Sequence, residues 1–178
     1  LGRTLEPGFP LLSTALYGLT IGAAAYLVPL ALDGSLAVVA WAGLAAALAW
    51  VRRRGETPAA RTGGIALLGL ATAHALVFEA RPDALLHGAD DLVAAIVALA
   101  AVGVAGVIAA GVRPEGRPAL LAGAGLGLLA LVSVATVSLL TPAGLRIGQD
   151  AQVALSALWA TSGFGILWFG LRRRRRPL

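Results

Sequence analysis

Long apolar stretches separated by short polar segments dominate this chain. Six of them approach or reach the roughly 17–25 residues that a helix needs to cross the hydrocarbon core of a bilayer. They cover residues 11–32, 35–51, 63–80, 92–112, 119–141 and 153–171. The apolar residues run continuously and do not alternate as the strands of a membrane barrel do, so each stretch is predicted to be an α-helix. We expect an all-α, polytopic integral membrane bundle of about six transmembrane helices, forming three successive hairpins in one domain over 1–178.

The composition strengthens the membrane assignment. Hydrophobic residues make up 58% of the chain and charged residues only 13%, whereas soluble domains carry about 25% charged residues. So few charges could not cover the surface of a soluble domain of this size. Cysteine is absent, which excludes disulfides and thiolate metal sites.

The arginines predict the orientation of the chain in the membrane. Every basic residue is Arg, and all except Arg81 and Arg146 lie in the two tails or in the loops at 52–62 and 113–118. Because cytoplasmic loops are enriched in basic residues, both ends are predicted to be cytoplasmic. The use of Arg without Lys, together with abundant Ala, Gly and Leu, is typical of a GC-rich bacterial genome. We therefore expect a multi-pass protein of the bacterial inner (cytoplasmic) membrane.

The basic run near the C-terminal end predicts a lipid partner in addition to the bilayer itself. Clusters of arginine beside a span are attracted to anionic headgroups. The arginines do not alternate with aromatic residues, so no nucleic acid partner is expected. The residues expected to contact anionic lipid are Arg172, Arg173, Arg174, Arg175 and Arg176.

The segment FEARPDALLHGADD, at the end of the third span, concentrates four of the nine acidic residues and one of the two histidines. Glu79 and Asp83 are four residues apart, and His87, Asp90 and Asp91 would share one face if they lay on a helix. Asp83, Asp90 and Asp91 are therefore candidate catalytic groups. His87, Asp90 and Asp91 are candidate ligands of a hard metal ion.

A purely structural interpretation accounts for the same segment. Pro82 would end the third helix, Asp83 would cap a short turn, and Gly88 would end that turn. Asp90 or Asp91 would then cap the next helix and interact with its dipole. Because this interpretation needs no ligand, we prefer it and predict no metal.

His74 is the second candidate, because an ionisable side chain within a span is costly and therefore points to function. Glu79 lies five residues further on, which is about 140° of rotation in an α-helix. The two side chains are thus predicted to lie on different faces, although both are intramembrane polar candidates. Hydroxyl groups of this and neighbouring spans are the expected partners of His74, namely Thr72, Ser133, Thr136 and Ser138.

Glycine-containing motifs point to helix packing. Gly123 and Gly127 form a GxxxG step, and Gly103, Gly106 and Ala110 form a stripe of small residues on the preceding span. Such residues let helix backbones approach closely in lipid. No dinucleotide-binding, phosphate-binding, hydrolase or metalloprotease motif occurs in the sequence, so no cofactor is expected.

Two stretches resemble the C-terminal half of the DUF2339 family of predicted bacterial membrane proteins. They are HALVFEARPDALLHGADDL at 74–92 and GQDAQVALSALWATSGFGILWFGLRRRRRPL at 148–178. The resemblance implies a longer polytopic protein whose remaining spans would be partners of this fragment, and it implies no catalytic residue. The matching positions in the second stretch are Ala154, Leu155, Ser156, Ala157, Leu158, Trp159, Gly163, Gly170, Leu171, Arg172 and Arg173.

Three functions remain open at this point. The first is a polytopic protein of transport or of the cell envelope, with His74 between the helices. The second is a membrane-embedded enzyme acting on a lipid-linked or envelope polymer, with Asp83, Asp90 or Asp91 as base or metal ligand. The third is a membrane scaffold without catalytic activity.

Overall fold

A computed structural model of the chain describes residues 10–52, 58–112, 116–141 and 146–174. These residues form seven α-helices and one π-helical turn, η1. In chain order the elements are α1 (Pro10–Ala31), α2 (Ser35–Arg52), α3 (Pro58–His74), η1 (Ala75–Glu79), α4 (Ala84–His87), α5 (Leu92–Val112), α6 (Arg117–Leu140) and α7 (Gln149–Arg174).

The helices confirm the predicted all-α membrane class. In the part of the chain that the structure describes, five helical segments are long and apolar enough to cross a membrane. They belong to α1, to α3 with its continuation, and to α5, α6 and α7. The second predicted span, Ser35–Val51, is an apolar helix that is shorter than the others. Each of the six predicted spans therefore overlaps a helix, and five of them are long and apolar enough to cross a membrane.

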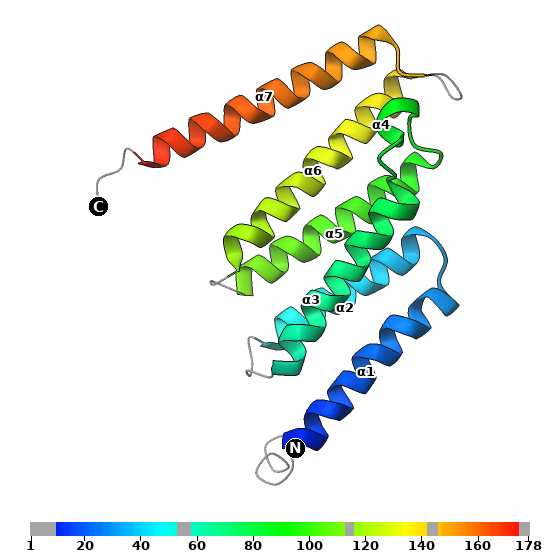
Figure 1. Cartoon of the computed structure of the whole chain (residues 1–178), viewed down its shortest axis with the longest axis vertical. Helices are drawn as coiled ribbons and strands as arrows, with labels where there is room; N and C mark the ends of the chain where they lie inside the picture. The colour runs from blue at the N-terminus through cyan, green and yellow to red at the C-terminus, as the bar shows by residue number, and fades with distance from the viewer. Residues whose placement is uncertain (1–9, 53–57, 113–115, 142–145, 175–178) are drawn as a thin grey trace.

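The closest packing of the helices extends beyond the pairs that are consecutive in the chain. The most closely packed pairs are α5 with α6, α2 with α3, and α2 with α5, whereas α1 and α7 make few contacts. Figure 1 shows α1 and α7 at opposite margins of the bundle, with α2, α3, α5 and α6 between them. The order of the spans along the chain determines which helices are consecutive, whereas the closest packing depends on which helix faces carry small side chains.

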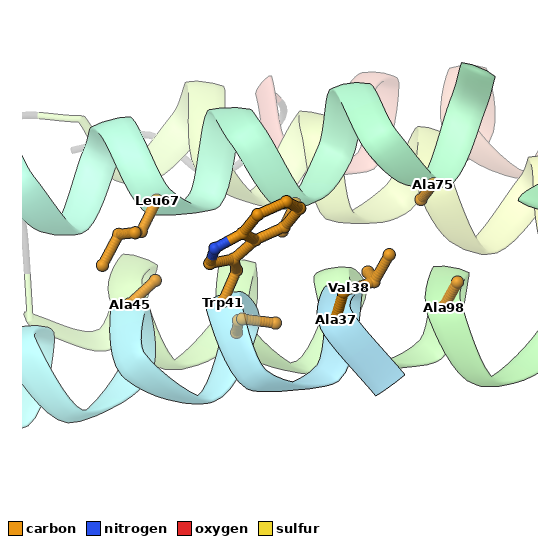
Figure 2. Packing of buried hydrophobic residues seen from close by; sticks show 10 residues of the cluster. Ala37, Val38, Trp41, Ala45, Leu67, Ala75 and Ala98 are labelled. Carbon is orange, nitrogen blue, oxygen red and sulfur yellow. The ribbon is translucent and has the colours of Figure 1, made fainter. Parts of the chain in front are cut away.

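A three-helix seam of small residues forms the centre of the bundle. Figure 2 shows Trp41 of α2 between the alanines of this seam and directed towards α3. Because lipid is as apolar as the side chains, close backbone approach and van der Waals contact hold such helices together. The buried residues of the seam are Ala37, Val38, Trp41, Ala42, Ala45, Leu67, Ala71, Ala75, Ala98 and Ala105.

Helix α6 approaches α5 through only one of the two glycine motifs. A Cβ atom on Gly106 would lie 3.5 Å from Cβ of Ala124, whereas added Cβ atoms on Gly123 and Gly127 would have no atom within 4 Å. Gly123 and Gly127 instead line an apolar cavity of about 430 Å³ between α3, α5 and α6. The expected role of the GxxxG step in packing within the chain is therefore wrong.

A side-chain hydrogen bond connects α7 to α6. The indole Nε1 of Trp159 donates to Oγ of Ser133 at 3.0 Å, and Ser133 is fully buried and itself donates to the carbonyl of Leu129. Because the buried hydroxyl both donates and accepts, its hydrogen bonds offset the cost of removing it from water.

Candidate functional site

A π-helical turn continues α3 without interruption and carries the candidate site. The backbone N–H of Ala80 donates to the carbonyl of Ala75 at 2.7 Å, five residues earlier. The turn ends at Ala80, whose backbone leaves the helical region with φ −124°. π-turns within α-helices are rare and occur frequently at functional sites.

The π-turn brings His74 and Glu79 together. Nε2 of His74 lies 4.0 Å from Oε1 of Glu79, so the prediction that the two side chains occupy different faces is wrong. In an α-helix residues four apart stack on successive turns, but the i to i+5 hydrogen bonding of a π-turn stacks residues five apart. The pair is mostly withdrawn from the surface, with side-chain exposures of 22% for His74 and 11% for Glu79.

Two aromatic rings enclose the imidazole of His74. The indole of Trp41 meets it edge to face at 5.5 Å between centroids, and the ring of Phe78 lies at 4.6 Å. The hydroxyls expected as partners are occupied elsewhere. Those of Thr72, Ser133 and Thr136 donate to backbone carbonyls four residues earlier, and Oγ of Ser138 accepts from Ala89.

The carboxylate of Glu79 lies against the turn between α1 and α2. A Cβ atom on Gly34 would lie 3.4 Å from Oε1 of Glu79, and Gly34 has a φ of +57°. This left-handed conformation is accessible to glycine at little cost. The sequence Asp33-Gly34 thus provides both the turn and the space in which the carboxylate lies.

Trp41 connects the site to α1 through a gap that proline creates. Its Nε1 donates to the carbonyl of Ala25 at 3.2 Å. That carbonyl would normally accept from the residue four positions later, but this residue is Pro29, which has no N–H. The indole therefore satisfies an acceptor that α1 itself cannot satisfy.

The carboxylates that follow the π-turn, Asp83, Asp90 and Asp91, do not form a site with the pair. α4 ends at His87, Gly88 follows with φ +82°, and α5 begins at Leu92. His87, Asp90 and Asp91 therefore do not share one helix face, contrary to the geometry that made them candidate ligands. Glu79 and Asp83 are likewise separated by the end of η1.

The structural interpretation of this segment holds only in part. Gly88 ends α4, with its N–H donating to the carbonyl of Ala84, and Oδ1 of Asp91 accepts from the N–H of Ala94 at 2.9 Å. Asp83 occupies the N-cap position of α4, but its side chain makes no capping hydrogen bond. Two hydrogen bonds connect this segment to its neighbours: the N–H of Ala89 donates to Oγ of Ser138, and the N–H of Ile147 donates to the carbonyl of Leu86.

Asp91 and Asp90 provide a matched test of this capping. Asp91→Ala is expected to lower the free energy of unfolding by about 1 kcal/mol, because the N–H of Ala94 loses its acceptor. Asp90→Ala, which removes an exposed carboxylate next to it, is expected to leave stability unchanged within about 0.5 kcal/mol. Denaturant unfolding in detergent micelles measures both, and equal losses would contradict the assignment of Asp91 as the cap.

The geometry of the pair suits a proton better than a metal ion. Among the residues that the structure describes, no three His, Asp or Glu side chains are grouped so that they could hold a metal. One imidazole and one carboxylate can share a proton, since an imidazole N–H donates a hydrogen bond and a carboxylate oxygen accepts one. The sequence did not predict the π-turn or the role of Trp41. The one signal for Trp41 was Pro29, which has no N–H to donate to the carbonyl of Ala25 four residues earlier.

Comparisons of the chain with protein-family models, with curated proteins and with solved structures found no match. The resemblance to the DUF2339 family therefore stays a prediction that rests on the two quoted stretches.

Proposed function

We propose that this chain is a polytopic transport protein of the bacterial cytoplasmic membrane in which His74 and Glu79 form a proton-binding pair. The observation that carries the proposal is the 4.0 Å approach of the two side chains at a π-turn, near the end of a membrane-spanning helix. An isolated carboxylate in an apolar environment is costly. A neighbouring imidazole offsets that cost by sharing a proton or by pairing as a cation.

The proposal includes an orientation and lipid partners. The arginine-rich loops and both ends of the chain would face the cytoplasm, and the pair would lie towards the opposite side. Arg172 is exposed on the last turns of α7, where it would meet anionic headgroups. Arg173 and Arg174 lie on the same helix, while Arg175 and Arg176 lie outside the described residues. Further spans of a longer DUF2339-like protein would complete the assembly.

No specific observation favours an enzyme. An enzyme of the proposed kind needs carboxylates that converge on one pocket, whereas Asp83, Asp90 and Asp91 are exposed and belong to two different turns. Two apolar cavities, of about 430 and 510 Å³, lie along α5 and α6, and neither is lined by these carboxylates. The transport proposal uses an ionisable pair whose side chains approach to 4.0 Å, His74 and Glu79.

Proton movement through reconstituted vesicles tests the proposal. The chain would be placed in vesicles of phosphatidylcholine and phosphatidylglycerol that contain a pH-sensitive dye. A pH gradient would then be imposed across the vesicle membrane. We expect the wild-type chain to collapse the gradient faster than protein-free vesicles do. Glu79→Gln should lower the protein-dependent rate roughly 10²-fold, the scale for losing a proton-transfer group.

Asp83→Asn is the matched control, because it neutralises a carboxylate four residues away that lies outside the pair. Its rate should equal that of the wild type. A wild-type rate equal to that of empty vesicles, or a Glu79→Gln rate equal to that of Asp83→Asn, would refute the proton-binding role.

A further inference from the structure

Helix α1 is the least firmly held of the helices around the site. None of its most apolar 18-residue window is buried, and Figure 1 shows it at the margin of the bundle. Leu19, Tyr26 and Leu30 are largely exposed. A helix with so little buried surface can separate from its neighbours at small cost, because the surrounding lipid replaces the lost contacts.

Ala25, Val28 and Leu32 of α1 pack against the seam, and two further contacts of α1 are local. The first is the hydrogen bond from Trp41 to the carbonyl of Ala25. The second is the packing of Ile21 against Gly63 of α3, where an added Cβ atom would collide with the Ile21 side chain. The first contact is directional, so it is sensitive to a small displacement of the indole ring.

The indole of Trp41 and the turn at Gly34 are also the places where α1 and α2 meet the His74–Glu79 pair. Trp41 contacts the imidazole edge to face, a geometry that depends on the charge distribution of both rings. Charging the imidazole would draw it from 4.0 Å towards hydrogen-bonding distance of Glu79 and change its contact with the indole.

Other titratable groups on the surrounding elements are few. Over residues 35–51 and 92–112, α2 and α5 carry none. Tyr17 and Tyr26 on α1 are exposed, Asp33 lies in the turn before α2, and Arg81 makes no ion pair with Glu79. Arg61 lies near the start of α3, thirteen residues before His74, and the ionisable side chain that contacts the indole of Trp41 is His74 itself.

We propose that α1 is a mobile helix whose docking on α2 and α3 depends on the charge of the His74–Glu79 pair, with Trp41 as the coupling residue. The inference rests on the proton-binding site proposed above and assigns that site a regulated element. With the imidazole neutral α1 is docked as observed, and with the imidazole charged the Trp41 hydrogen bond is lost and α1 separates.

Cross-linking in this naturally cysteine-free chain tests the coupling. Ile21→Cys and Gly63→Cys would form one pair, because Cγ1 of Ile21 lies 3.2 Å from the Cβ position of residue 63. Ala45→Cys and Leu67→Cys, which face each other across α2 and α3 in Figure 2, would form a reference pair. Both pairs would be cross-linked with a short thiosulfonate reagent, and the cross-linking rate of the first pair would be divided by that of the reference pair. This ratio cancels the pH dependence of thiol chemistry.

We expect this ratio to be about two- to ten-fold higher at roughly pH 8 than at roughly pH 5. Histidine in general changes charge between these pH values. The fold-change corresponds to the energy of an aromatic contact. His74→Phe and Trp41→Phe, which lacks the N–H donor, should abolish the difference. The reference pair reports whether α2 and α3 remain packed in each variant.

Two results would overturn the coupling. One is a pH-independent ratio in the wild-type background, and the other is an unchanged pH dependence in Trp41→Phe. Either result combined with loss of proton flux in Glu79→Gln would refute the coupling and leave the proton site intact. Unchanged flux in Glu79→Gln would instead refute the site.

Discussion

Trp41→Ala is expected to lower the free energy of unfolding by about 3 kcal/mol, the lower end of the range for removing a buried aromatic side chain. Trp41 is 3% exposed and lies in the seam between α2, α3 and α5. In a membrane the transfer of apolar surface contributes little, so the cost comes from lost van der Waals contacts and from a carbonyl left without a donor. That carbonyl belongs to Ala25 and receives no backbone hydrogen bond from Pro29, because proline has no N–H.

Two further variants separate these contributions. Trp41→Phe keeps a ring in the seam and removes only the N–H donor, so it should cost about 1 kcal/mol. Trp168→Ala removes an indole that is 60% exposed on α7 and should cost less than about 1 kcal/mol. Unfolding by sodium dodecyl sulfate in mixed micelles, followed by circular dichroism, measures all three. Equal losses for Trp41→Ala and Trp168→Ala would show that Trp41 does not hold the seam.

Ala98→Leu is expected to destabilise the bundle by about 2 kcal/mol, because a larger side chain in a close-packed site forces backbones apart. Ala98 on α5 is fully buried in the same seam as Ala37 and Ala71. Close approach in lipid requires such small side chains. The same micelle unfolding experiment measures the loss.

Ala100→Leu provides a matched control on the same helix. Ala100 is exposed and lines an apolar cavity of about 510 Å³ between α5 and α6, so the same added atoms meet open space. Its stability should stay within about 0.5 kcal/mol of the wild type. If Ala98→Leu were equally harmless, the seam would not depend on small residues.

The positions of the helices were predictable because hydropathy over about 20 residues is a strong signal. Each predicted span coincides with a helix, and the turns at Gly34 and Gly88 and the cap at Asp91 follow from local chemistry. The pairing of helices was not predictable. The seam alanines on α2, α3 and α5 lie on spans in which Ala is abundant everywhere, so the buried alanines are indistinguishable in sequence from the exposed ones.

The site was predictable in its members but not in its geometry. Both His74 and Glu79 stood out as ionisable groups near the third span. Their separation of five residues argued against a pair, since the regular α-helix was the assumed geometry. A π-turn leaves no pattern in a single sequence, because its extra residue is an ordinary Ala, Leu, Val or Phe in the segment ALVFE.

By itself, the sequence determined that the chain is an all-α membrane protein, where its helices run, and which few residues are chemically unusual. These properties depend on composition and on interactions between residues close along the chain. Only the tertiary structure decided that α2, α3 and α5 form the centre of the bundle. It also decided that the indole of Trp41 donates to the carbonyl of Ala25 and that His74 lies beside Glu79. Helix contacts in lipid are selected by close fit between faces, and such fit exists only once the helices are placed against one another.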